Sequence, residues 1–154
     1  MTDSEGVPQA PAAEIEDFIR QCDDGLRHQV SGDSDPFLAL WSHAEDVAIL
    51  GAIGSRARGW EDVRSHILYA GRRLDWTSVS VERIAVIVDR DLALSVSLER
   101  MTREVNRTTE ARTLRVTHAY RREHGRWRLI LRHANQVTPE DEDREREILG
   151  HEPG

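Results

Sequence analysis

The hydrophobic positions along the chain change their period near its middle. Between Glu14 and Leu74 apolar residues recur every three or four positions, the spacing that puts them on one face of an α-helix. From Trp76 to Val137 apolar and polar residues alternate, or β-branched residues gather, as in the strands of a sheet. Helices first and strands second predict an α+β domain whose helices cover one face of the sheet.

The first half of the chain predicts three helices and one short strand. The first helix, about four turns long, is indicated by an apolar stripe: Ile15, Phe18, Ile19, Cys22 and Leu26. Asp35 and Pro36 suit the N-cap and first turn of a short second helix. The stretch DVAILG, residues 46–51, is typical of a strand. After the loop GAIGSRARG, a third helix carries the stripe Trp60, Val63, Ile67, Ala70 and Leu74.

The second half predicts four strands joined by short turns. They are expected in WTSVSVERIAVIV, LALSVSLERM, RTLRVTHAYRR and RWRLILRHANQV, and the separators are DRD, a polar loop and HG. Such short connections favour an antiparallel meander.

Composition and charge narrow the class of protein. A chain of 154 residues fits one compact domain. Its formal charge of −7 repels phosphate and argues against a nucleic-acid partner. No basic leader with an apolar run opens the chain, and no stretch of about 18 apolar residues occurs, so we expect a cytoplasmic protein without a membrane partner. Cys22, the single cysteine, cannot form an internal disulfide, and its place on the first stripe predicts a buried thiol.

Both ends of the chain are polar and lie outside the periodic pattern. Residues 1–12 carry two prolines and predict a disordered N-terminal tail. Residues 139–154 are rich in charge and predict an acidic C-terminal tail, with a short helix or a contact to a partner subunit as alternatives. The domain itself is expected over residues 13–138.

The last two expected strands form the most informative segment, RVTHAYRREHGRWRLILRHANQ, residues 115–136. His124 and Gly125 suit a two-residue type I′ turn, because both tolerate positive φ. That turn would pair Tyr120 with Leu129, His118 with Leu131, Val116 with His133, and Leu114 with Asn135. A bulged three-residue turn would shift this pairing and move Arg132 to the cavity side instead.

The predicted pairing separates two surfaces of the hairpin. One would be mainly apolar with few polar groups, as ligand cavities are, and would carry His118, Tyr120, Trp127, Leu129, Leu131, His133 and Asn135. The other would carry Arg115, Thr117, Arg121, Arg128, Ile130 and Arg132. Glu99 falls on the side of Ala93, Ser95 and Ser97 in the preceding strand, and we expect it to form a structural ion pair with an arginine of the hairpin.

Two segments resemble the SnoaL-like branch of the ketosteroid isomerase and nuclear transport factor 2 superfamily, over roughly Glu14 to Val137. They are FLALWSHAEDVAILGAIGSRARGWEDVRSHI and LRVTHAYRREHGRWRLILRHAN. The resemblance implies N-terminal helices packed on a curved, mainly antiparallel sheet, a cone-shaped half-barrel with an internal pocket, and frequent homodimers through the outer sheet face. Isomerases, dehydratases, cyclases, transport adaptors and assembly domains all share this scaffold, so the fold does not fix the function.

Two functions follow as hypotheses. In the first, the pocket binds a small, largely apolar organic molecule and supports isomerase, cyclase or dehydratase chemistry, with His133 as the base and His118 and Tyr120 as proton donors. Trp41, Trp60, Trp127, Leu129, Leu131 and Asn135 would line that pocket. Related sequences often carry an aspartate at the position of Asn135, and the amide here removes one candidate base. In the second hypothesis, the domain is a non-catalytic dimerising or assembly module.

Other chemistries find less support in the sequence. The seven histidines form no metal-binding motif, there is no cysteine pair, and His118 with His133 would lack a third ligand, so no metal is expected. The glycines of GAIGSRARG fit no nucleotide-binding spacing, so no cofactor is expected. The hairpin arginines are expected to pair with carboxylates, including those of a second subunit, since aromatic residues for RNA stacking are not interleaved with them.

Overall fold

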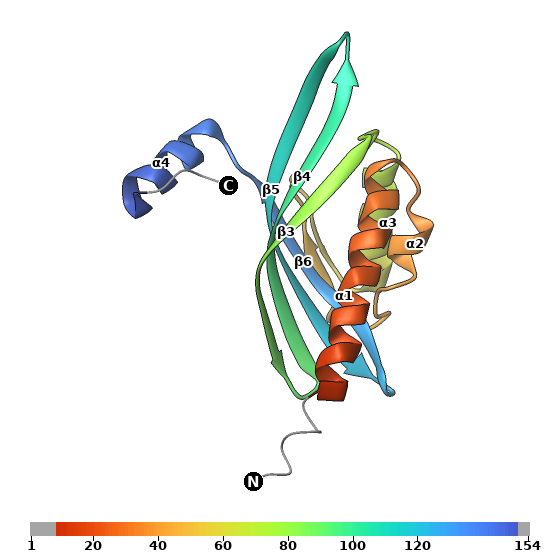
Figure 1. The fold of residues 1–154 in the computed structure, drawn as a ribbon. Coiled ribbons are helices and arrows are strands. Elements are labelled where there is room, and N and C mark those ends of the chain that lie inside the picture. The colour runs from red at the N-terminus through yellow and green to blue at the C-terminus, as the bar shows by residue number, and fades with distance from the viewer. Residues whose placement is uncertain (1–8, 151–154) are drawn as a thin grey trace.

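A computed structural model describes residues 9–150 of the chain. The helices are α1 (Gln9–Val30), α2 (Asp35–Leu38), α3 (Trp60–Gly71) and α4 (Pro139–Leu149). The strands are β1 (Ala48–Leu50), β2 (Arg56–Arg58), β3 (Ser78–Asp89), β4 (Leu92–Val105), β5 (Thr108–Glu123) and β6 (Arg126–Gln136). Figure 1 shows α1, α2 and α3 on the concave side of the sheet and α4 on the other side. The predicted α+β fold with helices on a curved sheet is confirmed.

The sheet has the strand order β2-β1-β6-β5-β4-β3. The meander of β3 to β6 is antiparallel, as predicted, and β1 lies parallel to β6, between β6 and the edge strand β2. The three-residue strand β2 was not expected, because it is too short to show a period within the glycine-marked loop. Through β1, the first half of the chain joins the sheet formed by the second half.

The turn between β5 and β6 has the predicted form. Glu123 pairs with Arg126 across a two-residue turn, and His124 and Gly125 both have positive φ, 52° and 77°. The predicted pairing of Tyr120 with Leu129 is also confirmed.

Beyond Leu129 the predicted pairing of the hairpin is wrong. Ala119 pairs with Leu131, so Ile130 is an extra residue on β6, and from there His118 pairs with Arg132 instead of Leu131. A bulge of one residue sends every later side chain to the opposite face. Val116 therefore pairs with Ala134, and Leu114 with Gln136, instead of His133 and Asn135. Arg132 turns to the concave face, while Leu131, His133 and Asn135 turn to the convex one.

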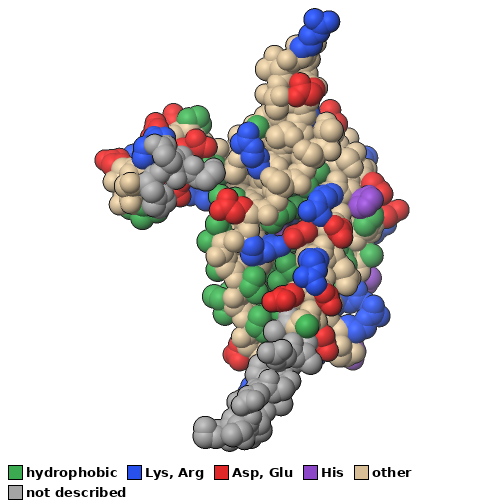
Figure 2. Space-filling view, in the orientation of Figure 1, with side chains coloured by type: hydrophobic (Ala, Val, Ile, Leu, Met, Phe, Trp, Pro, Cys, Tyr) green, Lys and Arg blue, Asp and Glu red, His purple; other side chains and the backbone are tan. Residues whose placement is uncertain are grey.

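The segment after β6 is the helix α4, where the charge run predicted an acidic tail with a short helix as one alternative. Thr138 caps it and forms a capping box with Asp141, and Gly150 ends it with a φ of 72°. None of its residues is buried, and Asp141 reaches Arg115 of the sheet at 3.7 Å. Figure 2 shows α4 and its charged side chains standing off the main body.

The predicted N-terminal tail is described only in part. Residues 1–8 lie outside the described residues, as do 151–154 at the other end. Helix α1 begins at Gln9, within the segment that was expected to be a tail. Among the described residues, no helix combines the length and the hydropathy needed to cross a membrane.

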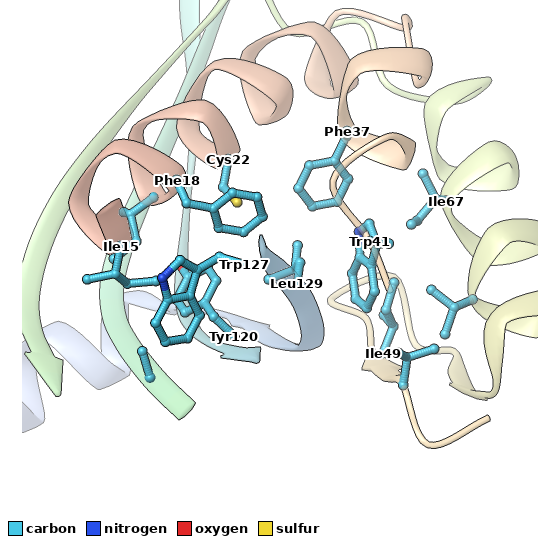
Figure 3. Packing of buried hydrophobic residues seen from close by; sticks show 14 residues of the cluster. Ile15, Phe18, Cys22, Phe37, Trp41, Ile49, Ile67, Tyr120, Trp127 and Leu129 are labelled. Atoms are coloured by element: carbon cyan, nitrogen blue, oxygen red, sulfur yellow. The ribbon is translucent and has the colours of Figure 1, made fainter. Parts of the chain in front are cut away.

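The core consists of two clusters on the concave face. In the first, Phe18 of α1 meets Tyr120 of β5 edge to face, with ring centroids 6.0 Å apart, and Leu129 packs beside them (Figure 3). The predicted burial of Cys22 is confirmed in this cluster. The second cluster is formed by Leu26, Val30, Trp76, Val79, Met101, Leu114, Val116 and Ala134.

Candidate functional site

A cavity of about 70 Å³ lies between the two core clusters, where α1 and α3 face the concave sheet. Its wall is mainly apolar and takes residues from both clusters, together with Ala70 of α3. The apolar residues are Leu26, Val30, Phe37, Ile49, Ile67, Ala70, Leu74, Met101 and Leu114. Gly51, Ala52 and Ile53 of the β1–β2 loop form its outer rim. The volume is about half that of an engineered 150 Å³ cavity that binds benzene. It suits a molecule of a few heavy atoms, or one end of a larger molecule.

Four polar side chains reach this apolar wall: Gln29 from α1, His66 from α3, Arg112 from β5 and Arg132 from β6. A few oriented polar groups in an apolar hollow are typical of a site for a small organic molecule. The geometry of each group decides what kind of molecule that is.

Arg132 reaches the cavity because the bulge at Ile130 turns it inward. Its guanidinium donates to both carboxylate oxygens of Glu99, at 2.8 and 2.9 Å, and to Nε2 of His118 at 3.0 Å. The expected pairing of Glu99 with a hairpin arginine is confirmed, and Glu99 is 2% exposed. A guanidinium has about five N–H donors, so Arg132 keeps donors for an oxygen atom of a ligand beyond these three bonds.

His118 and Tyr120 lie behind Arg132, and neither lines the cavity. Because Arg132 donates to Nε2 of His118, the proton of the neutral imidazole is on Nδ1, which lies 3.5 Å from the Tyr120 hydroxyl. That hydroxyl also bonds Ser95 Oγ at 2.8 Å. Burial, and next the charge of Arg132, lower the pKa of His118 well below its ordinary 6.5, and burial raises the pKa of Tyr120. Both side chains are therefore neutral, and His118 contacts Arg132 directly whereas Tyr120 contacts His118.

His66 stands at the outer end of the cavity. It is half-buried, and its Nδ1 makes a short hydrogen bond with Ser55 Oγ from the β1–β2 loop. A Cβ at position 51 would lie 2.5 Å from the imidazole Cε1, so Gly51 gives the ring its place over the loop. Burial, and next the charge of Arg132, lower the pKa of His66. A neutral imidazole at the cavity can act as a base.

The position of His66 in the sequence indicates that it faces the cavity, although it was not among the predicted site residues. His66 follows Val63 by three positions and precedes Ala70 by four, so it lies on the buried stripe of α3. An imidazole on such a stripe faces the same space as its apolar neighbours. Arg132 was placed on the cavity side only as an alternative that required a three-residue turn, whereas the turn has two residues and the extra residue is Ile130.

The structure brings together only two of the three predicted catalytic residues. His118 and Tyr120 lie side by side, but His133, the predicted base, is exposed on the convex face, and the prediction that it faces the pocket is wrong. Asn135 is exposed on the same face, and Leu131 is half-buried there. The physical reason in each case is the extra residue Ile130.

The other predicted pocket residues take part in packing instead. Trp41, Trp127 and Leu129 belong to the first core cluster (Figure 3), and none of them lines the cavity between α1, α3 and the sheet. Trp60 is half-buried and stacks on His43, with ring centroids 4.1 Å apart. Within residues 9–150, no three His, Cys, Asp or Glu side chains are grouped so as to hold a metal ion.

Comparisons with known proteins place the fold. A family profile described as SnoaL-like domain matches residues 21–138. No curated protein matches the chain. A solved candidate association domain of calcium/calmodulin-dependent protein kinase type II from Thiobacillus denitrificans has a TM-score of 0.67 and 19% identity, covering 80% of this chain and 94% of that one.

Two further solved structures are similar at the same level. A candidate dehydratase of the NTF2-like family from Streptomyces avermitilis has a TM-score of 0.67 and 15% identity, covering 85% of this chain and 99% of its own. A nuclear transport factor 2 superfamily protein from Salmonella enterica has a TM-score of 0.64 and 17% identity, covering 86% and 94%. At such identities these likenesses establish the fold alone.

Proposed function

Because this chain belongs to the SnoaL-like domain family, which the match over residues 21–138 establishes, we propose that it binds a small, largely apolar organic molecule between α1, α3 and the concave sheet. The observation that carries the proposal is the cavity of about 70 Å³, whose wall is apolar and whose buried donor Arg132 is held by Glu99 and His118. A donor that its neighbours hold in place in a mainly apolar cavity orients a ligand without having to be ordered first.

The cations at the cavity indicate that the ligand carries an oxygen atom that accepts hydrogen bonds. Arg132 keeps N–H donors beyond its bonds to Glu99 and His118. Arg112 lies over the ring of Trp76, 5.3 Å from its centroid, and within residues 9–150 it has no carboxylate partner. A carbonyl or carboxylate oxygen fits this end of the cavity, and a hydrocarbon fits the rest.

Acid–base chemistry of the isomerase, cyclase or dehydratase kind is the finer form of this proposal. His66, kept neutral by burial, takes the place of His133 as the candidate base. A base that removes a proton next to a carbonyl leaves negative charge on the oxygen, and the donors of Arg132 would stabilise that charge. Glu99 and His118 hold Arg132 in position and do not reach the cavity themselves.

Small ketones, carboxylic acids and alcohols test the binding site directly. We expect the methyl NMR signals of Ile49, Ile67 and Leu114 to shift on titration, because these side chains line the cavity. Ala70→Leu should abolish the shifts, since an added isopropyl group fills part of the cavity. Its matched control, Ala111→Leu on the exposed surface of β5, should leave them unchanged.

Two results would contradict this assignment. A ligand that shifts signals elsewhere and binds Ala70→Leu as well as the unmodified protein would place the site outside the cavity. A library of such compounds that leaves all three methyl groups unperturbed would remove the proposed function itself.

A specific observation also favours the second hypothesis, a dimerising module. Ile87, Leu92 and Leu94 lie on the convex face and are 59%, 54% and 40% exposed. Contiguous exposed apolar surface is uncommon on soluble monomers and marks interaction sites. We propose that a second copy of the chain covers this face. An assembly role agrees with the name of the Thiobacillus denitrificans neighbour, and it leaves the cavity on the opposite face free.

A further inference from the structure

Gln29, a residue of the cavity wall, carries an unpaired hydrogen-bond acceptor. The side chain comes from the last turn of α1, lines the cavity and is 5% exposed. Its Oε1 atom is buried and has no hydrogen-bond partner among the described residues. Buried polar atoms of native proteins are almost always paired, so an unpaired one at a cavity indicates an absent partner.

The orientation of the Gln29 amide is fixed by its other end. Nε2 donates to the carbonyl oxygen of Ile67 at 3.0 Å. Exchanging Nε2 and Oε1 would set two acceptor oxygens against each other, so the unpaired atom is the oxygen. Gly71 makes this packing possible, because a Cβ there would lie 2.1 Å from Ser34 Oγ and 3.6 Å from Gln29 Nε2.

The remaining polar groups of the cavity do not supply the missing donor. The guanidinium of Arg132 is bonded to Glu99 and His118, and Nδ1 of His66 is bonded to Ser55. Arg112 lies over the ring of Trp76, and none of these three side chains bonds Oε1. The rest of the wall is chiefly hydrocarbon. A molecule that occupies the cavity without donating to Oε1 would keep that atom unpaired, which disfavours its binding.

We propose that the ligand of this cavity carries a hydroxyl or N–H group that donates to Oε1 of Gln29. The inference rests on the proposed function and narrows its ligand class. Together with the acceptor oxygen expected near Arg132, it favours hydroxy-carbonyl compounds and amides over hydrocarbons, ethers and simple ketones. A site built to bond a donor discriminates against analogues that lack it more strongly than a hydrocarbon wall discriminates by size.

Two isomers test the proposal: butan-1-ol, which has a hydroxyl donor, and methyl propyl ether, which has none. We expect the intact protein to bind the alcohol about 10-fold more tightly, measured from methyl NMR titrations of Ile49 and Ile67. In Gln29→Met the two isomers should bind alike, because the acceptor is gone. Gln21→Met, an exposed position on the same helix, should keep the preference.

The outcomes separate this inference from the proposed function. If the ether binds the intact protein as well as the alcohol does, or if Gln29→Met keeps the preference, the inference is overturned while the proposed function stands. If neither isomer nor any compound of the wider library binds, both are overturned. Should Gln29→Met fail to fold, the comparison of the two isomers on the intact protein still tests whether the cavity prefers a hydrogen-bond donor.

Discussion

His118 shows how one residue couples the stability of this protein to pH. It is 4% exposed, and its Nε2 accepts a hydrogen bond from Arg132, so the folded protein holds it as a neutral imidazole. In the unfolded chain the same imidazole is hydrated and takes up a proton near its ordinary pKa of 6.5. Between these two pKa values the unfolded state binds more protons, so the free energy of unfolding falls as the pH falls below 6.5.

His118→Gln should weaken this dependence on pH. The imidazole contributes a loss of up to about 1.4 kcal/mol per pH unit below its unfolded pKa, and an amide does not titrate. We expect urea denaturation to show the free energy of unfolding of the unmodified protein falling between pH 7 and pH 5, and falling less in the variant. His28→Gln, at an exposed position, serves as the control. Equal slopes in the unmodified protein and His118→Gln would disprove the argument.

At the scale of the element, one extra residue in β6 decides which side chains of that strand face the cavity. The sequence predicted β5, β6 and the turn at His124 and Gly125, because alternation and positive-φ residues are local signals. The sequence alone could not show that a bulge occurs at Ile130. Leu129, Ile130 and Leu131 are apolar in succession, so the pattern fits both phases of the strand.

The contribution of the Glu99–Arg132 ion pair to stability tests this strand register. Removing one partner leaves a buried charge unpaired, so Glu99→Gln and Arg132→Met should each lower the free energy of unfolding by about 3–5 kcal/mol. The double variant should lose less than the sum, because the two side chains interact. Urea denaturation measures all three, and the exposed pair of Asp24 and Arg27 provides the control Asp24→Asn.

The control should cost less than about 1 kcal/mol, the usual worth of an exposed ion pair. If Glu99→Gln costs no more than Asp24→Asn, Arg132 does not lie on the concave face. The bulge would then be misplaced, and the cavity would lose its main donor.

The cavity itself could not be predicted from local signals. Its wall comes from seven separate elements, and its polar residues stand far apart in the sequence, Gln29 on α1 and Arg132 on β6. A stripe or an alternation shows which face of an element is buried, but not whether the facing side chains fill the space between elements. The tryptophans expected around the pocket fill that space in the first core cluster.

At the scale of the whole molecule, the two faces of the sheet differ in kind. The concave face carries the core clusters, the buried ion pair and the cavity. The convex face presents Ile87, Leu92 and Leu94 to solvent, and hydrophobic side chains reach the surface on the side of the sheet where α4 lies (Figure 2). The proposed ligand site and the proposed dimer interface therefore lie on opposite faces and need not compete.

A charge on the convex face should weaken self-association. We expect sedimentation velocity to find dimers at micromolar concentration, and Leu94→Glu to shift them to monomers, since burying an unpaired carboxylate in an interface is unfavourable. Tyr69→Glu, at an exposed position on α3, should leave the dimer intact. A protein that sediments as a monomer before any substitution would refute the proposed interface.

The rim of the cavity has a practical consequence. Phe37, Ile49 and Ile67 close its inner side, whereas Ala52 and Ile53 of the β1–β2 loop border the solvent. A bound compound can therefore keep its hydrophobic end inside while a linker trails past the loop. Fluorescent dyes or affinity resins attached at that end would give a reagent for capturing the protein, without disturbing the packing that holds it together.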